Sequence, residues 1–164
     1  MVIDTPPTRP TRLQMALGVT RWVVVPTKSY RASIEGLQTL AQQNPSLGIL
    51  GAVLFDSGSS ATAVRRDANE DIAAALGNLA QPFTTTIRHA ESTAVRLREQ
   101  GQLAHELAAQ AESAEPFWQA LRDGRRPDRI PGSAGALAED YVLLTQELLA
   151  RIAESEITEE DQPA

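Results

Sequence analysis

Short apolar runs alternate with helical patterns along this chain, and this order constrains its fold more than any other feature. Residues 22–25 and 47–55 are almost wholly apolar, as is typical of strands buried on both faces of a sheet, and Pro26 closes the first. Residues 83–87 form a weaker strand pattern, because their threonine run alternates less clearly. This alternation predicts an α/β fold with a mostly parallel sheet of about four strands, flanked by helices in three layers.

The helical patterns lie between and after these runs. Their apolar residues recur at three- and four-residue steps. The stripes are Tyr30, Ile34, Leu37 and Leu40; Val64, Ala68, Ile72 and Leu76; Ala90, Ala94 and Leu97; Leu103 and Leu107; and Leu137, Tyr141, Leu144, Leu148 and Ile152. Ser29 is the expected N-cap of the first helix, and Gly77 and Gly101 are expected to follow the second and third.

The last third of the chain departs from this alternation. Residues 112–132 are rich in turn residues, with one short helix indicated near Trp118, and we expect a surface insertion there. The final stripe leaves Glu139, Asp140, Glu147 and Arg151 for a solvated face. Residues 154–164 are acidic with little to bury, which predicts a disordered tail after a domain over residues 1–153.

The segment Val2-Ile3-Asp4-Thr5-Pro6-Pro7 reads as an apolar strand that ends in a carboxylate and a proline-rich turn. A carboxylate at the carboxyl end of a buried parallel strand points into the crevice where open α/β sheets bind ligands, and there it can hold magnesium. The usual partner is a glycine-rich loop ending in Gly-Lys-Ser/Thr. The single lysine, Lys28, follows Pro26-Thr27 with no glycine before it, so the sequence lacks this phosphate loop.

Several further stretches follow that motif in a characteristic order. They are Trp22-Val23-Val24-Val25-Pro26-Thr27, Ser33-Ile34-Glu35-Gly36-Leu37, Leu50-Gly51-Ala52-Val53-Leu54, and Ser133-Ala134-Gly135-Ala136 leading to Tyr141 and Glu147. Together with the Asp-x-x-Pro strand end, this order resembles the later part of ParA-type partition ATPases, the P-loop NTPases that include the related MinD proteins. The resemblance implies a partial domain of that fold without its phosphate loop, serving plasmid, chromosome or phage DNA partition.

The resemblance also implies roles for particular residues. Asp4 would act on the magnesium shell or on the attacking water, and Pro6 and Pro7 would shape the adjacent switch turn. ATP and magnesium are the cofactors of the complete family member. Because the lysines of the phosphate loop are missing, we expect this chain to bind neither tightly and to hydrolyse no ATP alone.

The expected partners follow from the same resemblance. They are a ParA-like homodimer or full-length paralogue and a centromere-binding protein. The alternative is a non-enzymatic regulatory module that binds a full-length ParA-like partner or DNA. For nonspecific DNA contact the candidates are Arg65, Arg66, Arg88, Arg96 and Arg98. Instead of contacting DNA, these arginines could form a solvated surface of mixed charge together with nearby glutamates.

Composition narrows the classes of function. The net charge of −6 weighs against a chain-wide attraction to nucleic acid, and the absence of cysteine excludes thiolate metal sites and cysteine nucleophiles. No apolar run approaches the roughly 18 residues of a membrane helix. The acidic end of the chain also lacks the basic residues of a membrane-binding helix, and a cytoplasmic location is expected.

The missing phosphate loop creates a folding problem. In the family, the strand before that loop lies between the strand ending at Asp4 and the strand at residues 22–25, so its loss would expose two strand edges. Either the two remaining strands close up against each other, or another polypeptide fills the gap, or the native start lies elsewhere. Met1, three residues before Asp4, fits a fragment or a misassigned start.

Overall fold

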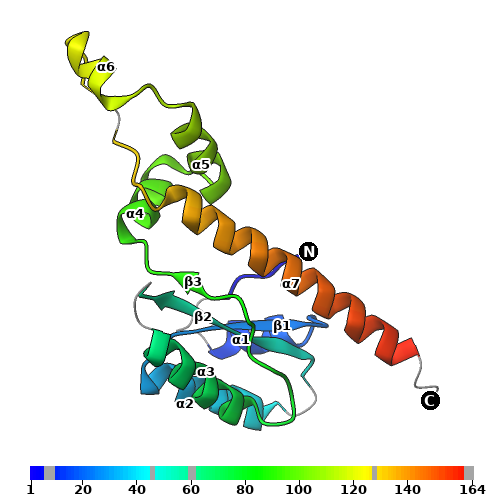
Figure 1. Cartoon of the computed structure of the whole chain (residues 1–164). Coiled ribbons are helices and arrows are strands. Elements are labelled where there is room, and N and C mark those ends of the chain that lie inside the picture. Colours follow the sequence, from blue (N-terminus) through cyan, green and yellow to red (C-terminus); the bar gives the residue numbers. More distant parts are fainter. Residues whose placement is uncertain (6–9, 45–46, 59–61, 127–128, 161–164) are drawn as a thin grey trace.

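The computed structural model describes residues 1–5, 10–44, 47–58, 62–126 and 129–160 (Figure 1). Its strands are β1 (Val23–Thr27), β2 (Ile49–Ser57) and β3 (Ile87–Arg88). Its helices are α1 (Pro10–Leu17), α2 (Arg31–Gln43), α3 (Thr62–Leu76), α4 (Glu91–Gln100), α5 (Ala104–Ser113), α6 (Phe117–Arg122) and α7 (Ala134–Glu160). The described strands pair in parallel in the order β1-β2-β3, with β2 in the centre.

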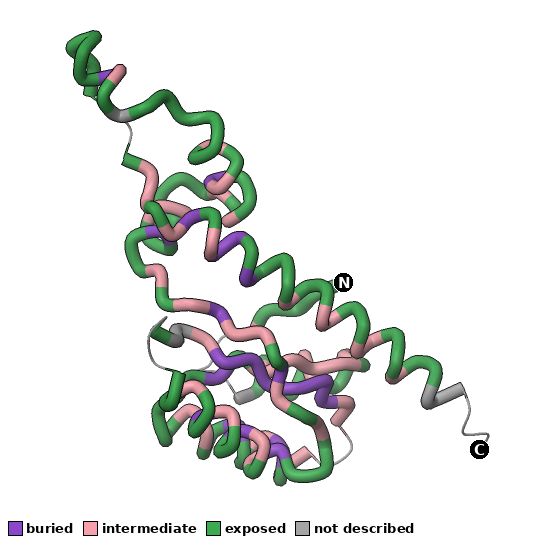
Figure 2. Tube along the Cα trace, in the orientation of Figure 1, coloured by how far each residue is buried: buried purple, intermediate pink, exposed green. Residues whose placement is uncertain are grey.

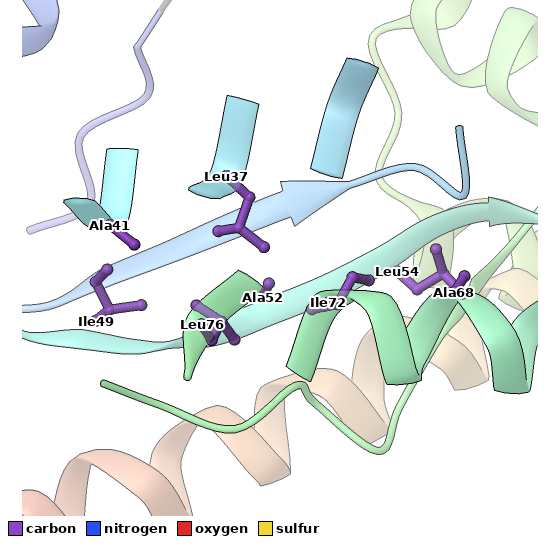
Figure 3. Close-up of a cluster of buried hydrophobic side chains, with 8 residues drawn as sticks. All are labelled: Leu37, Ala41, Ile49, Ala52, Leu54, Ala68, Ile72 and Leu76. Atoms are coloured by element: carbon purple, nitrogen blue, oxygen red, sulfur yellow. The ribbon is translucent and has the colours of Figure 1, made fainter. Parts of the chain in front are cut away.

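Helices cover both faces of this sheet, which confirms the α/β class with a flanked parallel sheet (Figure 1). On one face, α2 and α3 pack against β2 through a buried cluster (Figure 3). Its members are Leu37, Ala41, Ile49, Ala52, Leu54, Ala68, Ile72 and Leu76. On the other face, α7 contributes Leu137 to a second cluster with Leu50, Val53, Phe83 and Ile87. Burial is concentrated along β2, the strand with a neighbour on each side (Figure 2).

Residues 2–5 are not a strand, contrary to the sequence prediction, and the described sheet has three strands instead of about four. The segment has no regular secondary structure, and Met1 and Val2 are fully exposed. A strand is stabilised by ladder hydrogen bonds to a neighbour and by burial of one face. In the described chain residues 2–5 have no strand neighbour, so their apolar pattern has nothing to pair with.

The strand expected at residues 83–87 is reduced to β3, Ile87–Arg88. The Phe83 N–H donates to the Ala52 carbonyl at 2.8 Å, but the next two amides, those of Thr84 and Thr85, donate to the Glu147 carboxylate of α7. Amides committed to a side chain cannot join a ladder, which explains the short strand.

Strand β1 differs from its prediction in two ways. Its valines are half-buried instead of buried, and the strand contains Pro26 instead of ending before it. The Val23 N–H donates to the Gly48 carbonyl beside β2 at 2.8 Å. Since alternate residues of a strand face the same neighbour, Val25 and Thr27 also face β2, while Val24 and Pro26 face the open edge. A proline is tolerated at such an outward position because no ladder hydrogen bond is lost.

The helix ends are partly as predicted. Gly77 and Gly101 follow α3 and α4 with φ of 56° and 62°, a left-handed conformation that glycine adopts without strain. The N-cap of α2 is Tyr30 and not Ser29, and the Ser33 hydroxyl accepts the Lys28 N–H at 2.9 Å. The described helices include none that is long and apolar enough to cross a bilayer.

The predictions for residues 112–132 and for residues 154–164 have different outcomes. Helix α6 supplies the single short helix predicted in residues 112–132 and lies far from the sheet (Figure 1). The predicted disorder from residue 154 is wrong as far as Glu160, because α7 continues to that residue. Ile152 packs against the second cluster and Arg21 contacts Glu156 at 3.3 Å, so this part of the helix has packing partners. Residues 161–164 lie outside the described residues.

Replacing Gly51 by alanine is expected to destabilise the fold. Gly51 has a φ of 152°, and a Cβ there would lie 2.5 Å from Arg151 Nη1, 2.5 Å from the Gln81 carbonyl oxygen and 2.9 Å from the Phe83 ring. Overpacking of this kind, with a strained φ, costs about 2–4 kcal/mol in the free energy of unfolding. Urea denaturation followed by circular dichroism measures it.

The matched control is Gly36→Ala. A Cβ at Gly36 in α2 meets no atom within 4 Å, and alanine favours a helix by about 0.5–1 kcal/mol over glycine. Gly36→Ala should therefore be neutral or stabilising. Equal effects of the two substitutions would contradict this account of Gly51.

Candidate functional site

The guanidinium of Arg151 joins α7 to the sheet. Its Nη1 donates to the Leu50 carbonyl of β2 at 2.8 Å and to the Gln81 carbonyl at 2.7 Å, and its Nη2 donates to the Pro82 carbonyl at 2.7 Å. Its central carbon lies 4.0 Å from the centre of the Phe83 ring. A planar group with fixed donors suits this position, where several carbonyls converge over an aromatic face.

Glu147 completes this clamp, by which we mean Arg151 and Glu147 together. One carboxylate oxygen accepts from Arg151 Nη2 at 2.8 Å and from the Thr84 amide at 2.8 Å. The other accepts from the Thr84 hydroxyl and the Thr85 amide, both at 2.9 Å. Burial alone would raise the pKa of Glu147, but the hydrogen bonds from Thr84 and Thr85 outweigh it and lower the pKa from 4.5 to about 2.

A second ion pair holds the other half of α7. Arg88 of β3 donates to the two oxygens of Asp140 through Nε and Nη2, each at 2.7 Å, and its backbone N–H adds a third bond at 3.0 Å. Burial opposes ionisation of Asp140, yet Arg88 lowers its pKa, and Arg65 contributes through its charge. The pKa of Arg88 is raised in turn, chiefly by the Asp140 hydrogen bond.

Four polar residues of α7 were expected on a solvated face; Glu139 is exposed as expected, and the structure corrects the other three. Asp140 is 7% exposed, and the side chains of Glu147 and Arg151 are each 18% exposed. The sequence contains a signal that could have placed them. Residues 140 and 147 are seven apart, and 147 and 151 are four apart, so all three share the helix face of the apolar stripe. Among the residues the structure describes, these are the ones that sequence reasoning missed.

The predicted nucleotide residues are not brought together. Asp4 is exposed in a segment outside the sheet, and Pro6 and Pro7 lie outside the described residues. Lys28 follows β1, where its amide bonds Ser33. In the described parts of the chain, no cluster of three or more His, Asp or Glu side chains could hold a metal ion. Among the described residues, the side chains predicted for the nucleotide site therefore do not meet.

The arginines proposed for DNA contact have different surroundings. Arg88 is bonded to Asp140, near which Arg65 also lies. Arg66 is 3.1 Å from Asp67 and 3.8 Å from Glu70 on its own helix. On α4, Arg96 donates to the Arg129 carbonyl at 3.0 Å, and Arg98 is exposed. Nearby carboxylates therefore neutralise much of the positive charge of Arg65, Arg66 and Arg88.

Two of the hollows on the described surface lie beside candidate residues. An open cleft of about 520 Å³ between α3 and residues 84–86 is lined by Arg65, Arg66 and Glu70, among others, so its charges are mixed. An apolar groove of about 490 Å³ lies where α5 begins beside α7 and is lined by Leu97, Leu103, Tyr141 and Val142. Neither contains the donor set of a phosphate site, which needs convergent amides and a lysine.

The open edge of β1 is the remaining candidate. β1 pairs with β2 on one side, and no strand pairs with its other side in the described residues. Trp22, the residue before β1, has its indole Nε1 buried with no hydrogen-bond partner in the described structure. An unpaired edge on an apolar parallel sheet is a template for another polypeptide.

Comparisons with known proteins add no assignment. No family model, no curated protein and no solved structure matches this chain. The resemblance to ParA-type ATPases therefore depends on the sequence motifs alone.

Acid is expected to destabilise the fold through Glu147. Its folded pKa of about 2 lies below the ordinary 4.5, so its stabilising contribution is complete above about pH 5 and is lost as pH falls toward 2. Glu147→Gln should lower the free energy of unfolding at pH 7 by about 1–3 kcal/mol and flatten its fall between about pH 5 and 2. Urea midpoints across this range measure both effects.

The control for Glu147 is Glu35→Gln on α2. Glu35 pairs with Arg31 at 2.7 Å, but the two side chains are 56% and 91% exposed, and such pairs contribute about 0–1 kcal/mol. An acid dependence that is the same in Glu147→Gln and the unmodified protein would refute the role of the clamp.

Arg88→Ala is expected to destabilise the protein by about 2–4 kcal/mol, because it leaves the nearly buried Asp140 carboxylate without its guanidinium. Arg98→Ala, at an exposed position, should change stability by less than about 0.5 kcal/mol. Thermal unfolding of both variants tests this. An Arg88→Ala variant of unchanged stability that has lost DNA binding would instead identify Arg88 as a DNA contact.

Proposed function

We propose that this chain is the carboxyl-terminal portion of a ParA-like fold that hydrolyses no ATP by itself and serves DNA partition by binding a ParA-like ATPase. The observation that carries the proposal is the parallel sheet that ends at β1, with no strand beyond it in the described chain. In the family that the motifs resemble, the strand of the phosphate loop occupies this position. The open edge is thus where another polypeptide would complete the sheet.

The physics of parallel sheets supports this proposal. Such sheets are normally covered on both faces and commonly have four to six strands. An exposed apolar edge of such a sheet is a template for pairing with another chain. Here helices cover both faces, while β1 has half-buried valines and an outer edge that pairs with no strand in the described residues. Binding of a strand would satisfy those groups and exclude water from Val24 and Trp22.

The chemistry of the chain supports the absence of turnover. Phosphoryl transfer needs a lysine and amides around the phosphates, with magnesium between them. Lys28 is the only lysine, and no glycine loop precedes it. Asp4 would contribute to magnesium or water positioning only in an assembly that supplies the phosphate loop.

ATP hydrolysis and binding test the proposal together. The purified chain should show no turnover above a protein-free blank, and Asp4→Asn should change nothing. A full-length ParA-like ATPase from the same source, immobilised on resin, should retain the chain, and its own turnover should change when the chain is added.

Two results would overturn the proposal. One is turnover by the chain alone that Asp4→Asn abolishes. The other is a folded chain that the ParA-like ATPase does not retain. Retention by DNA alone, with affinity that falls steeply as salt rises, would transfer support to a DNA-binding module.

A further inference from the structure

We infer that residues 1–5 of a second copy add as a parallel strand to the open edge of β1, forming a symmetric, strand-exchanged dimer. The inference rests on the proposed function only for the idea that a polypeptide binds this edge. It names a second copy of the chain as that polypeptide when no other partner is present. Two unpaired elements of the same chain carry it, the edge and the apolar segment.

The edge has defined hydrogen-bonding groups. Because Val23, Val25 and Thr27 face β2, the backbone N–H of Val24 and the carbonyl groups of Val24 and Pro26 face outward. Pro26 has no N–H to donate, so an added strand meets one donor and two acceptors over this stretch. The buried and unpartnered Nε1 of Trp22, just before the strand, is a further donor beside the edge.

The apolar segment has the matching properties. Val2 and Ile3 are β-branched, as strand residues commonly are, and they are 98% and 40% exposed. The segment belongs to no helix or strand and pairs with no strand of its own chain in the described structure. Addition to a strand edge would bury these side chains and provide partners for their backbone groups.

The geometry of the chain permits a reciprocal exchange. Residues 6–22, which include α1, connect the segment to β1, so the segment is not tied closely to the edge of its own chain. Every copy carries one segment and one edge. A two-fold dimer therefore pairs the edge of β1 in both copies and uses both segments.

Cross-linking between different chains tests the inference, because the protein has no cysteine. One preparation carries Val2→Cys or Ile3→Cys, a second, differently tagged preparation carries Val24→Cys, and the two are mixed and oxidised. A disulfide between the two tags is expected for at least one pair, since Val2 and Ile3 point to opposite faces of an added strand. Thr39→Cys, exposed on α2, replaces Val24→Cys as the control and should give no cross-link.

A variant of the edge gives an independent test. Val24→Pro removes the outward N–H without removing a bond to β2, and it should weaken dimerisation about tenfold. Val24→Ala controls for the loss of side-chain packing and should remain dimeric. Light scattering after size exclusion, at matched concentrations, distinguishes a dimer from the 17.7 kDa monomer.

Two results would overturn the inference. One is a protein that stays monomeric at all accessible concentrations. The other is a disulfide formed within a single chain of a double variant, either Val2→Cys/Val24→Cys or Ile3→Cys/Val24→Cys. A ParA-like ATPase that retains such a monomer would leave the proposed function intact. A folded monomer that it does not retain would overturn both.

Discussion

The contact between the Arg151 guanidinium and the backbone of β2 and residues 81–82 determines how α7 lies on the sheet. Leu50, Gln81 and Pro82 would otherwise present carbonyl oxygens beneath a helix, where an unpaired acceptor costs about 1–3 kcal/mol. Arg151 satisfies all three, and Glu147 balances its charge. The close approach this requires explains why residue 51 is glycine, since a Cβ would collide with the guanidinium.

The same clamp shapes the sheet around it. Because Glu147 accepts the Thr84 and Thr85 amides, the strand that the apolar pattern suggests is cut to Ile87–Arg88. Arg88 then meets Asp140 two turns earlier on α7, so two ion pairs fix the helix along one face. One face of the sheet is thus held by charged side chains as well as by apolar packing. The opposite face, under α2 and α3, is held by a wholly apolar cluster.

The open edge of β1 follows from the same architecture. Helices cover the faces of a sheet but leave its edges to other strands. At one side of the described sheet, β3 is very short and is bonded to α7. At the other side, β1 is longer and has no strand beyond it in the described residues, and this is the edge at which we propose that another polypeptide binds.

Local pattern was enough to predict β2, the helices around it and the short helix near Trp118, because apolar periodicity and turn residues act over a few neighbours. It failed at residues 2–5, since a strand exists only where another strand pairs with it. Because Asp140, Glu147 and Arg151 are charged, the local pattern also predicted that they face solvent, although their spacing matches the buried stripe.

The sequence by itself determined the α/β class, the absence of a phosphate loop and the absence of thiol chemistry, because these depend on which residues are present and in what order. Only the tertiary structure decided which charged residues are buried, which backbone amides donate hydrogen bonds to the Glu147 carboxylate, and which strand edge is left open in the described sheet. Those outcomes depend on contacts between segments 50 to 100 residues apart, as between Arg151 and Leu50 or Arg88 and Asp140.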